Sequence, residues 1–168
     1  SQMDFKLVPL DKPERSSTEF YLVDIENYEK TPTTVNISWD GQYGANQNVP
    51  FEFTFFNENR GLIKDVRYTY VAFDEFDNEI ARYDGDDSVS PGIVSTEGID
   101  IQNIYIPSAG PIRFDILVYG TGLDYDPTYS GIGSTIIELG TGTTQSTTPN
   151  ESVVLETTSI PSWVKNNA

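Results

Sequence analysis

Hydrophobic and polar residues alternate along most of the chain, as they do in strands that have one buried and one solvated face. The clearest alternating sets are Val35, Ile37 and Trp39, then Phe51, Phe53 and Phe55, and then Ile112, Phe114, Ile116 and Val118. In contrast, no stretch keeps an apolar stripe of helical period over three turns. The pattern therefore predicts an all-β protein.

Turn residues divide the chain into about seven strands, counted from Thr34, with Gly, Asn, Asp or Pro recurring about every 8–12 residues. The expected strands are 34–39, 49–56, 63–73, 79–83, 99–106, 112–120 and 132–139. This number and spacing predict an immunoglobulin-like Greek-key β-sandwich, with a jelly roll or a small barrel as alternatives. We expect 99–106 and 112–120 to pair with each other, and the short, polar segment 79–83 to lie at a sheet edge.

Composition changes along the chain and indicates three parts. Residues 1–30 form an N-terminal extension with one or two strands, of which 20–25 is too apolar to remain in water. Residues 31–140 form the sandwich domain. Residues 141–168 are mostly a linker rich in Thr, Ser and Gly, followed by a segment that contains a tryptophan.

Charge and residue usage exclude several classes of function. The chain has 26 acidic and 10 basic side chains, a net charge of −16, and neither histidine nor cysteine. Without imidazole and thiol groups, zinc sites, thiolate nucleophiles, histidine bases and disulfides are ruled out. Because phosphate binding depends on Lys and Arg, the charge also argues against a nucleic-acid partner and against binding to an anionic membrane. No apolar run is long enough to span a bilayer, so this segment is not expected to insert into one. We expect a protein that is not an enzyme.

Half of the net charge lies between Asp74 and Asp100, which suggests calcium as a candidate cofactor. The candidate metal ligands are Asp84, Asp86, Asp87, Asp124 and Asp126. These carboxylates, from two loops, would supply the hard oxygen ligands that Ca²⁺ prefers. The alternative is that solvated acids on an edge hairpin keep the protein soluble and prevent unwanted strand pairing.

Tyrosines in or near loops suggest a second kind of site. Tyr125 and Tyr129 are the candidate ligand-binding residues, because an exposed tyrosine ring is a stacking surface for sugars. The alternative is ordinary packing, since aromatic residues are common in strands and at interfaces.

Two segments resemble parts of extracellular proteins. Residues 104–118 (IYIPSAGPIRFDILV) resemble the aromatic-x-Pro-x-Ala-Gly-x-Tyr-x-hydrophobic-x-Val hairpin of extracellular β-sandwich modules, with Ile112 where those modules carry tyrosine. Residues 160–168 (IPSWVKNNA) resemble the start of a Trp-rich repeat, Ile-Pro-x-Trp-x-Lys-Asn-Asn-Ala-Gly-Trp-Trp, common in secreted and surface-anchored proteins of ammonia-oxidising archaea. The resemblance implies an archaeal protein that is exported to the cell surface as part of a longer architecture.

The expected function is therefore that of a non-catalytic structural or adhesive module of a cell-surface protein. Its partners would be another protein or further copies of the chain, and a glycan is an additional candidate. One alternative is a calcium- or carbohydrate-binding accessory module of a larger extracellular protein. Another is a subunit that assembles by β-strand donation, with the N-terminal segment or residues 153–155 completing the sheet of another copy.

Overall fold

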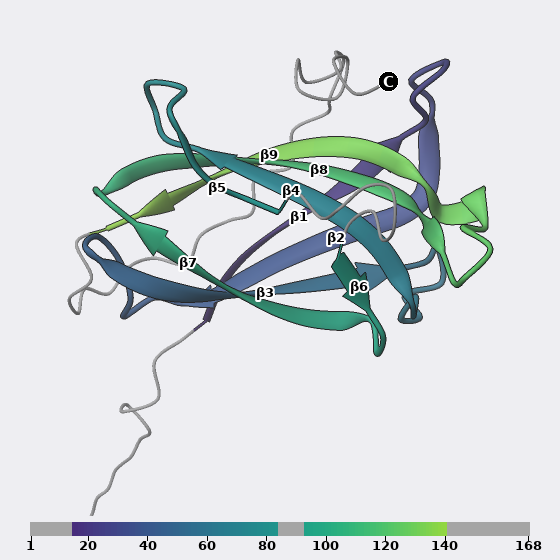
Figure 1. Cartoon of the computed structure of the whole chain (residues 1–168), viewed down its shortest axis with the longest axis horizontal. Helices are drawn as coiled ribbons and strands as arrows, with labels where there is room; N and C mark the ends of the chain where they lie inside the picture. Colours follow the sequence, from purple (N-terminus) through teal and green to yellow (C-terminus); the bar gives the residue numbers. More distant parts are fainter. Residues whose placement is uncertain (1–14, 84–92, 141–168) are drawn as a thin grey trace, which may run out of the picture.

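The computed structural model of the chain describes residues 15–83 and 93–140, and its secondary structure is almost entirely β (Figure 1). The strands are β1 (Arg15–Val23), β2 (Lys30–Asp40), β3 (Gln47–Phe56), β4 (Val66–Phe73), β5 (Glu79–Arg82), β6 (Ile93–Ser95), β7 (Ile99–Ile106), β8 (Gly110–Thr121) and β9 (Gly131–Leu139). One short 3₁₀ helix, η2 (Pro127–Tyr129), precedes β9. The all-β prediction is confirmed. No helix in the described residues is long and apolar enough to cross a membrane.

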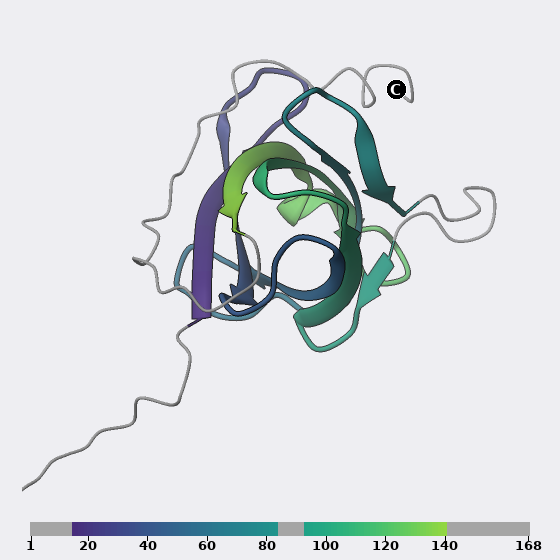
Figure 2. The same cartoon turned by 90° about the vertical axis from the view of Figure 1, so that its left-hand side faces the viewer.

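The strands form an antiparallel sheet in the order β5-β4-β8-β9-β1-β2-β3-β7, with β6 paired to β4 beside this path. Figure 2, turned by 90° from Figure 1, shows that the sheet is nearly closed into a barrel. The β1–β9 junction is narrow, because these strands pair at Val23 and Ile132. The sheet therefore has two halves, β1-β2-β3-β7 and β5-β4-β8-β9, which face each other across the core.

One expected pairing is wrong. The segments 99–106 and 112–120 correspond to β7 and β8, but β7 pairs with β3, whereas β8 pairs with β4 and β9. The turn between them therefore carries the chain from one half of the sheet to the other. Alternation predicts which face of a strand is buried, but it contains no information about which strand lies beside it.

The core lies between the two halves and is rich in aromatic rings. Phe53 on β3 stacks on Tyr70 of β4, with ring centroids 5.5 Å apart, and it meets Phe114 of β8 edge to face at 5.8 Å. All three side chains are at most 5 % exposed. The inward faces predicted from alternation in β3 and β8 are thus confirmed, because a period of two places every second side chain on the same side of a strand.

Some element boundaries differ from the prediction. The strand expected over 63–73 begins at Val66, because Asp65 has a positive φ of 56° and the preceding residues form a loop against β3. In the N-terminal part, β1 starts at Arg15 and ends at Val23, within the range in which extra strands are expected. The short strand β6 was not predicted from the pattern. The predicted edge position of 79–83 is confirmed, since β5 is one end of the strand order.

Candidate functional site

Four loops gather at one end of the sheet and form what we call the loop end. They are residues 24–29, 57–65, 96–98 and 122–130. Antiparallel pairing brings them together, because it places the end of one strand beside the start of its neighbour. At this end of the sheet lie the ends of β1, β3 and β8 and the starts of β4, β7 and β9. In Figure 1 these loops lie on the right-hand side.

The loop 122–130 folds back on itself and is fixed by its own backbone. Thr121 and Asp126 exchange two backbone hydrogen bonds, with N···O distances of 3.0 and 2.9 Å. Tyr125 lies between them with a positive φ of 55°. Gly120 permits this arrangement: a Cβ at its position would lie 2.7 Å from the carbonyl carbon and oxygen of Tyr125. The close approach of the two backbones therefore requires glycine at 120.

Arg67 on β4 connects the sheet to this loop. Its Nε donates to the carbonyl oxygen of Gly122 at 2.7 Å, and its guanidinium lies over the ring of Tyr125, 4.9 Å from the centroid. A hydrogen bond and a cation–π contact from one side chain fix both the start and the tip of the turn. The backbone N–H of Gly122 also donates to the carbonyl oxygen of Asp65 at 2.9 Å, so that loops 57–65 and 122–130 are joined directly.

Unusual backbone conformations are concentrated at the loop end. Within the described ranges, six residues other than glycine have positive φ, and four of them lie in these loops: Tyr28, Arg60, Asp65 and Tyr125. Positive φ is costly for a side chain as bulky as tyrosine, and it persists where the surrounding contacts determine it. The loops are thus held in specific, strained conformations, a feature often found where a protein binds a partner.

The loop end also exposes apolar side chains. Leu123 is 86 % exposed, and Leu62 and Tyr28 are about half exposed. Apolar groups on a rigid loop lose little conformational entropy when a partner covers them. The loop end is therefore a preformed surface with exposed apolar side chains on its loops.

The structure places two of the five predicted metal ligands. Asp124 and Asp126 are exposed in loop 122–130, whereas Asp84, Asp86 and Asp87 lie outside the described residues. The carboxylate of Asp126 accepts hydrogen bonds from the backbone N–H of Thr128 at 3.0 Å and from its hydroxyl at 2.8 Å. These bonds, the backbone one first, hold the pKa of the Asp126 carboxyl below its ordinary value. Asp126 thereby caps η2.

Calcium binding by these residues stays a prediction. In residues 15–83 and 93–140, no three acidic side chains come together as a group that could hold a metal ion.

The two predicted ligand-binding tyrosines are half-buried and have different surroundings. Tyr125 has Arg67 over its ring. Tyr129 packs against the main core, and its carbonyl oxygen accepts a hydrogen bond of 2.9 Å from the hydroxyl of Thr33 on β2. The loop end brings these tyrosines onto one loop with Asp124 and Asp126. Sugar binding by either ring stays a prediction.

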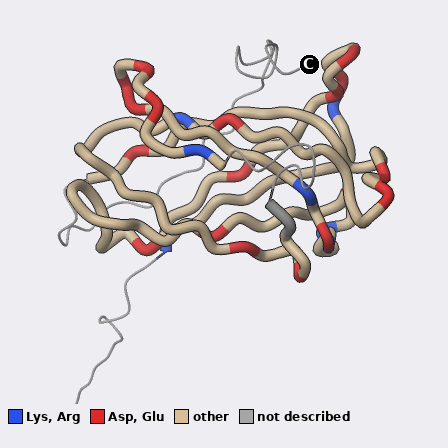
Figure 3. Tube along the Cα trace, in the orientation of Figure 1, with Lys and Arg blue, Asp and Glu red and all other residues tan. Residues whose placement is uncertain are grey.

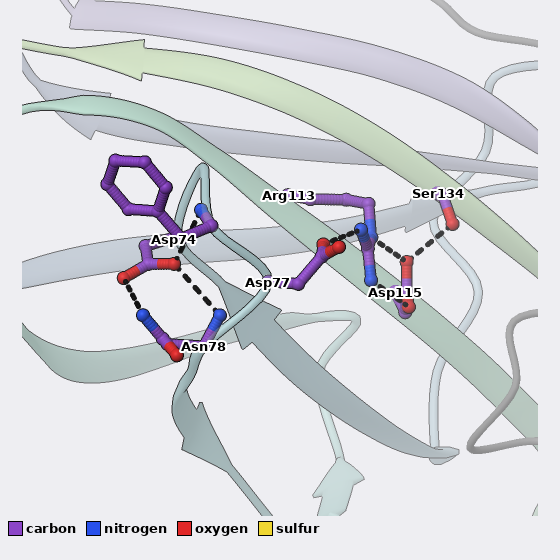
Figure 4. A network of polar contacts seen from close by, with 7 residues as sticks. Asp74, Asp77, Asn78, Arg113, Asp115 and Ser134 are labelled. Carbon is purple, nitrogen blue, oxygen red and sulfur yellow. Dashed lines mark hydrogen bonds and ion pairs between the residues drawn. The ribbon is translucent and has the colours of Figure 1, made fainter.

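A polar network at the opposite end was missed by sequence reasoning (Figure 4). The buried carboxylate of Asp115 accepts hydrogen bonds from Arg113 Nε at 3.1 Å and from the Ser134 hydroxyl at 2.6 Å. Arg113 also donates from Nη1 to Asp77 at 2.9 Å, and Asp77 belongs to the β4–β5 hairpin. An aspartate within an apolar strand, Phe114-Asp115-Ile116, is the signal that could have indicated this site.

A carboxylate also fixes the conformation of the β4–β5 hairpin tip at this end. The Asp74 carboxylate accepts hydrogen bonds from the backbone N–H groups of Asn78 and Phe76, both at 2.9 Å, and these bonds, that of Asn78 first, hold its pKa below the ordinary value. Phe76 is left 75 % exposed at the tip. Figure 3 shows that acidic positions are found on the loops at both ends of the molecule, so the exposed Leu123 and Phe76 both lie on loops that carry carboxylates.

Comparison of the chain with protein-family models, with curated proteins and with solved structures found no match.

Proposed function

We propose that the chain is a non-catalytic adhesive module with an immunoglobulin-like sandwich fold, displayed on a cell surface, and that its loop end binds a protein partner. The strand order supports the immunoglobulin-like assignment. In such folds consecutive strands are divided between two facing sheets by Greek-key connections. Here β2, β3 and β7 lie in one half and β4, β5, β8 and β9 in the other, with β1 as an additional N-terminal strand.

The position of the strained loops supports binding at this end. Immunoglobulin-like modules carry variable binding loops at the end of a rigid sandwich, because loops tolerate sequence change that strands do not. A single observation carries the proposal. The hydrogen bond from Arg67 to Gly122 and the contact of Arg67 with the Tyr125 ring fix the residues on both sides of Leu123, and Leu123 itself is almost fully exposed. An apolar side chain held in place on a fixed loop loses little conformational entropy when a partner covers it, so Leu123 can serve as a contact residue.

The charge supports a protein partner at a cell surface. A net charge of −16 disfavours nucleic acid, and the resemblance of residues 160–168 to a repeat of surface-anchored archaeal proteins favours an exported location. Acidic groups around an apolar tip would discourage contacts with other acidic surfaces and so contribute to specificity.

The experiment uses beads coated with the 168-residue chain and cell-envelope proteins from an ammonia-oxidising archaeon as the probe. We expect saturable binding that Leu123→Asp weakens by about ten-fold or more, because an apolar side chain that the partner would cover is replaced by a charge. Phe76→Asp is the matched control, since Phe76 is a similarly exposed apolar residue at the other end. Equal binding by the wild type and by Leu123→Asp, or no saturable binding at all, would overturn the proposal.

A further inference from the structure

The two strands at the ends of the sheet order, β5 and β7, differ in how they are protected. β5 has four residues, and its exposed Glu79 and Arg82 form an ion pair of 2.8 Å. A short, charged strand is a poor template for pairing with another chain. β7 has eight residues, and in the described part of the chain it pairs on one side, with β3. The edge at β7 is the one that could accept another strand.

The β7 edge has the regular geometry that strand addition requires. Its pairing with β3 runs from Gln47 and Ile106 to Thr54 and Ile99 without a shift in register. The backbone N–H of Phe55 donates to the carbonyl oxygen of Gly98 at 3.3 Å. Hydrogen bonding alternates along an antiparallel strand, so the even-numbered residues of β7 face β3. The backbone N–H and C=O groups of Ile99, Ile101, Asn103 and Tyr105 therefore point away from β3, to the side on which β7 pairs with no other strand of the described residues.

The same four residues carry exposed side chains. Ile101 is 59 %, Tyr105 50 % and Ile99 43 % exposed, and Asn103 is exposed between them. Single exposed apolar residues are common, but here three of the four outward positions of one edge strand are apolar, and they form a strip that only Asn103 interrupts. The residues of this strip are also those whose backbone groups have no strand partner among residues 15–83 and 93–140, a combination found in edges that bind an additional strand.

Charge distinguishes this strip from the rest of the surface. The chain carries a net charge of −16, so two copies repel each other at most orientations. The charged residue of β7 is Asp100, which points inward and accepts hydrogen bonds from Tyr68 at 2.7 Å and Gln102 at 2.8 Å. Beside the strip, Glu52 of β3 forms an ion pair of 3.6 Å with Arg15. The outward face of β7 is thus an uncharged place at which a second copy can approach.

We propose that β7 pairs antiparallel with β7 of a second copy of this chain, about a two-fold axis at Gln102. This register uses all four outward residues, because it places Ile99 opposite Tyr105 and Ile101 opposite Asn103 of the second copy. Aromatic and β-branched residues directly opposite each other are favourable cross-strand pairs. A two-fold axis makes the strand self-complementary, so one surface serves both copies. The interface is separate from the loop end and does not depend on the function proposed for that end.

The first measurement is sedimentation equilibrium of the 168-residue chain between about 10 μM and 1 mM, the range of a small, reversible interface. We expect a monomer–dimer equilibrium. Ile101→Lys and Asn103→Pro should each shift it to monomer by at least about ten-fold in Kd. The first replaces an apolar cross-strand contact with two like charges that lie diagonally across the two-fold axis, and the second removes an edge N–H. Asn103→Pro spares the pairing with β3, because the N–H of Asn103 points away from that strand. Ile136→Lys on β9 is the matched control, since Ile136 is 41 % exposed on the other half of the sheet.

Amide hydrogen exchange identifies the strand involved. In the dimer, the amides of Ile101 and Asn103 should become protected as concentration rises, whereas those of Gln102 and Ile104 are protected at every concentration. Circular dichroism and melting temperature confirm that each variant is folded. A wild type that stays monomeric at about 1 mM, or a dimer unaffected by Ile101→Lys, would overturn the proposal. It would also be overturned if deletion of residues 1–14 abolished the protection, because the occupant of the edge would then be the N-terminal segment.

Discussion

The hydroxyl of Tyr68 on β4 donates a hydrogen bond of 2.7 Å to the carboxylate of Asp100 on β7. The two residues belong to opposite halves of the sheet, and β7 is an end strand. Since β4 and β7 do not pair through their backbones, this side-chain bond ties the end of one half to the other. It sets the position of the β7 edge relative to the core.

Removal of this hydroxyl should loosen the attachment of β7. We expect Tyr68→Phe to lower the free energy of unfolding by about 1.5 kcal/mol, because a hydrogen bond to a charged acceptor is lost while the ring remains. Asp100→Asn should cost about half as much, since it keeps an acceptor oxygen. Urea denaturation measures both values. A Tyr68→Phe variant as stable as the wild type would show that the bond contributes nothing.

Two buried tyrosines predict a loss of stability at alkaline pH. Burial, and then the negative charge of Asp100, raise the pKa of Tyr68 well above its ordinary value and that of Tyr70 to about 12. Above pH 10 the unfolded chain releases protons that the folded chain retains, so the free energy of unfolding falls as pH rises. The stabilisation is fully present below pH 10. At about 1.4 kcal/mol per pKa unit, Tyr70 accounts for up to about 3 kcal/mol, lost as pH rises through 10 to about 12.

Denaturation at a series of pH values checks this prediction, with Tyr70→Phe as the comparison. The variant should lose less stability above pH 10 than the wild type. Parallel curves for the two proteins would show that Tyr70 titrates in the folded state as it does in the unfolded chain.

The network around Asp115 should be sensitive to loss of its cation. Arg113→Met leaves a carboxylate that is 2 % exposed without its Arg partner, and we expect the free energy of unfolding to fall by about 2 kcal/mol. Arg82→Met removes the cation of the more exposed Glu79 ion pair and should cost less than about 0.5 kcal/mol. Equal losses in the two variants, measured by urea denaturation, would contradict a special role for burial at Asp115.

Gly120, near the end of β8, should be less tolerant of a side chain than Gly122 in the neighbouring loop 122–130. Its φ is +156°, and a Cβ would lie 2.7 Å from the backbone of Tyr125, so we expect Gly120→Ala to cost about 2 kcal/mol. Gly122→Ala is the matched control. Its φ of +75° is strained for alanine, but a Cβ there meets nothing within 4 Å, so the expected cost is about 1 kcal/mol. Thermal unfolding gives both values, and near-ultraviolet circular dichroism reports the Tyr125 environment. A Gly120→Ala variant no less stable than Gly122→Ala would contradict the close approach.

Much of the fold could be predicted from local pattern. Phe51, Phe53 and Phe55 point into the core as expected, because strand geometry alternates side chains with a period that the sequence displays directly. The partners of each strand could not be predicted in the same way. The segments expected to pair with each other, 99–106 and 112–120, lie in different halves of the sheet.

The candidate site was predicted only in part. The sequence placed Tyr125, Asp124 and Asp126 in a loop, since Gly, Asp and Pro are turn residues. It did not indicate that Arg67 would lie over Tyr125, or that the backbone of Asp65 would join loop 57–65 to loop 122–130. These contacts arise when β4 and β8 align side by side, and no local preference specifies that alignment.

The sequence by itself thus determined the strand class, the buried faces, the acidic charge and the absence of histidine and cysteine chemistry. The tertiary structure decided which strands became neighbours, which strands lie at the ends of the described sheet and which loops met. The physical reason is the distance along the sequence over which each effect acts. Alternation and turn propensity act over a few residues, whereas pairing and loop contacts depend on burying strand faces that are far apart in the sequence. Ile101 illustrates the difference, because it is an ordinary strand residue in the sequence and becomes a candidate contact once β7 is the last strand of the sheet.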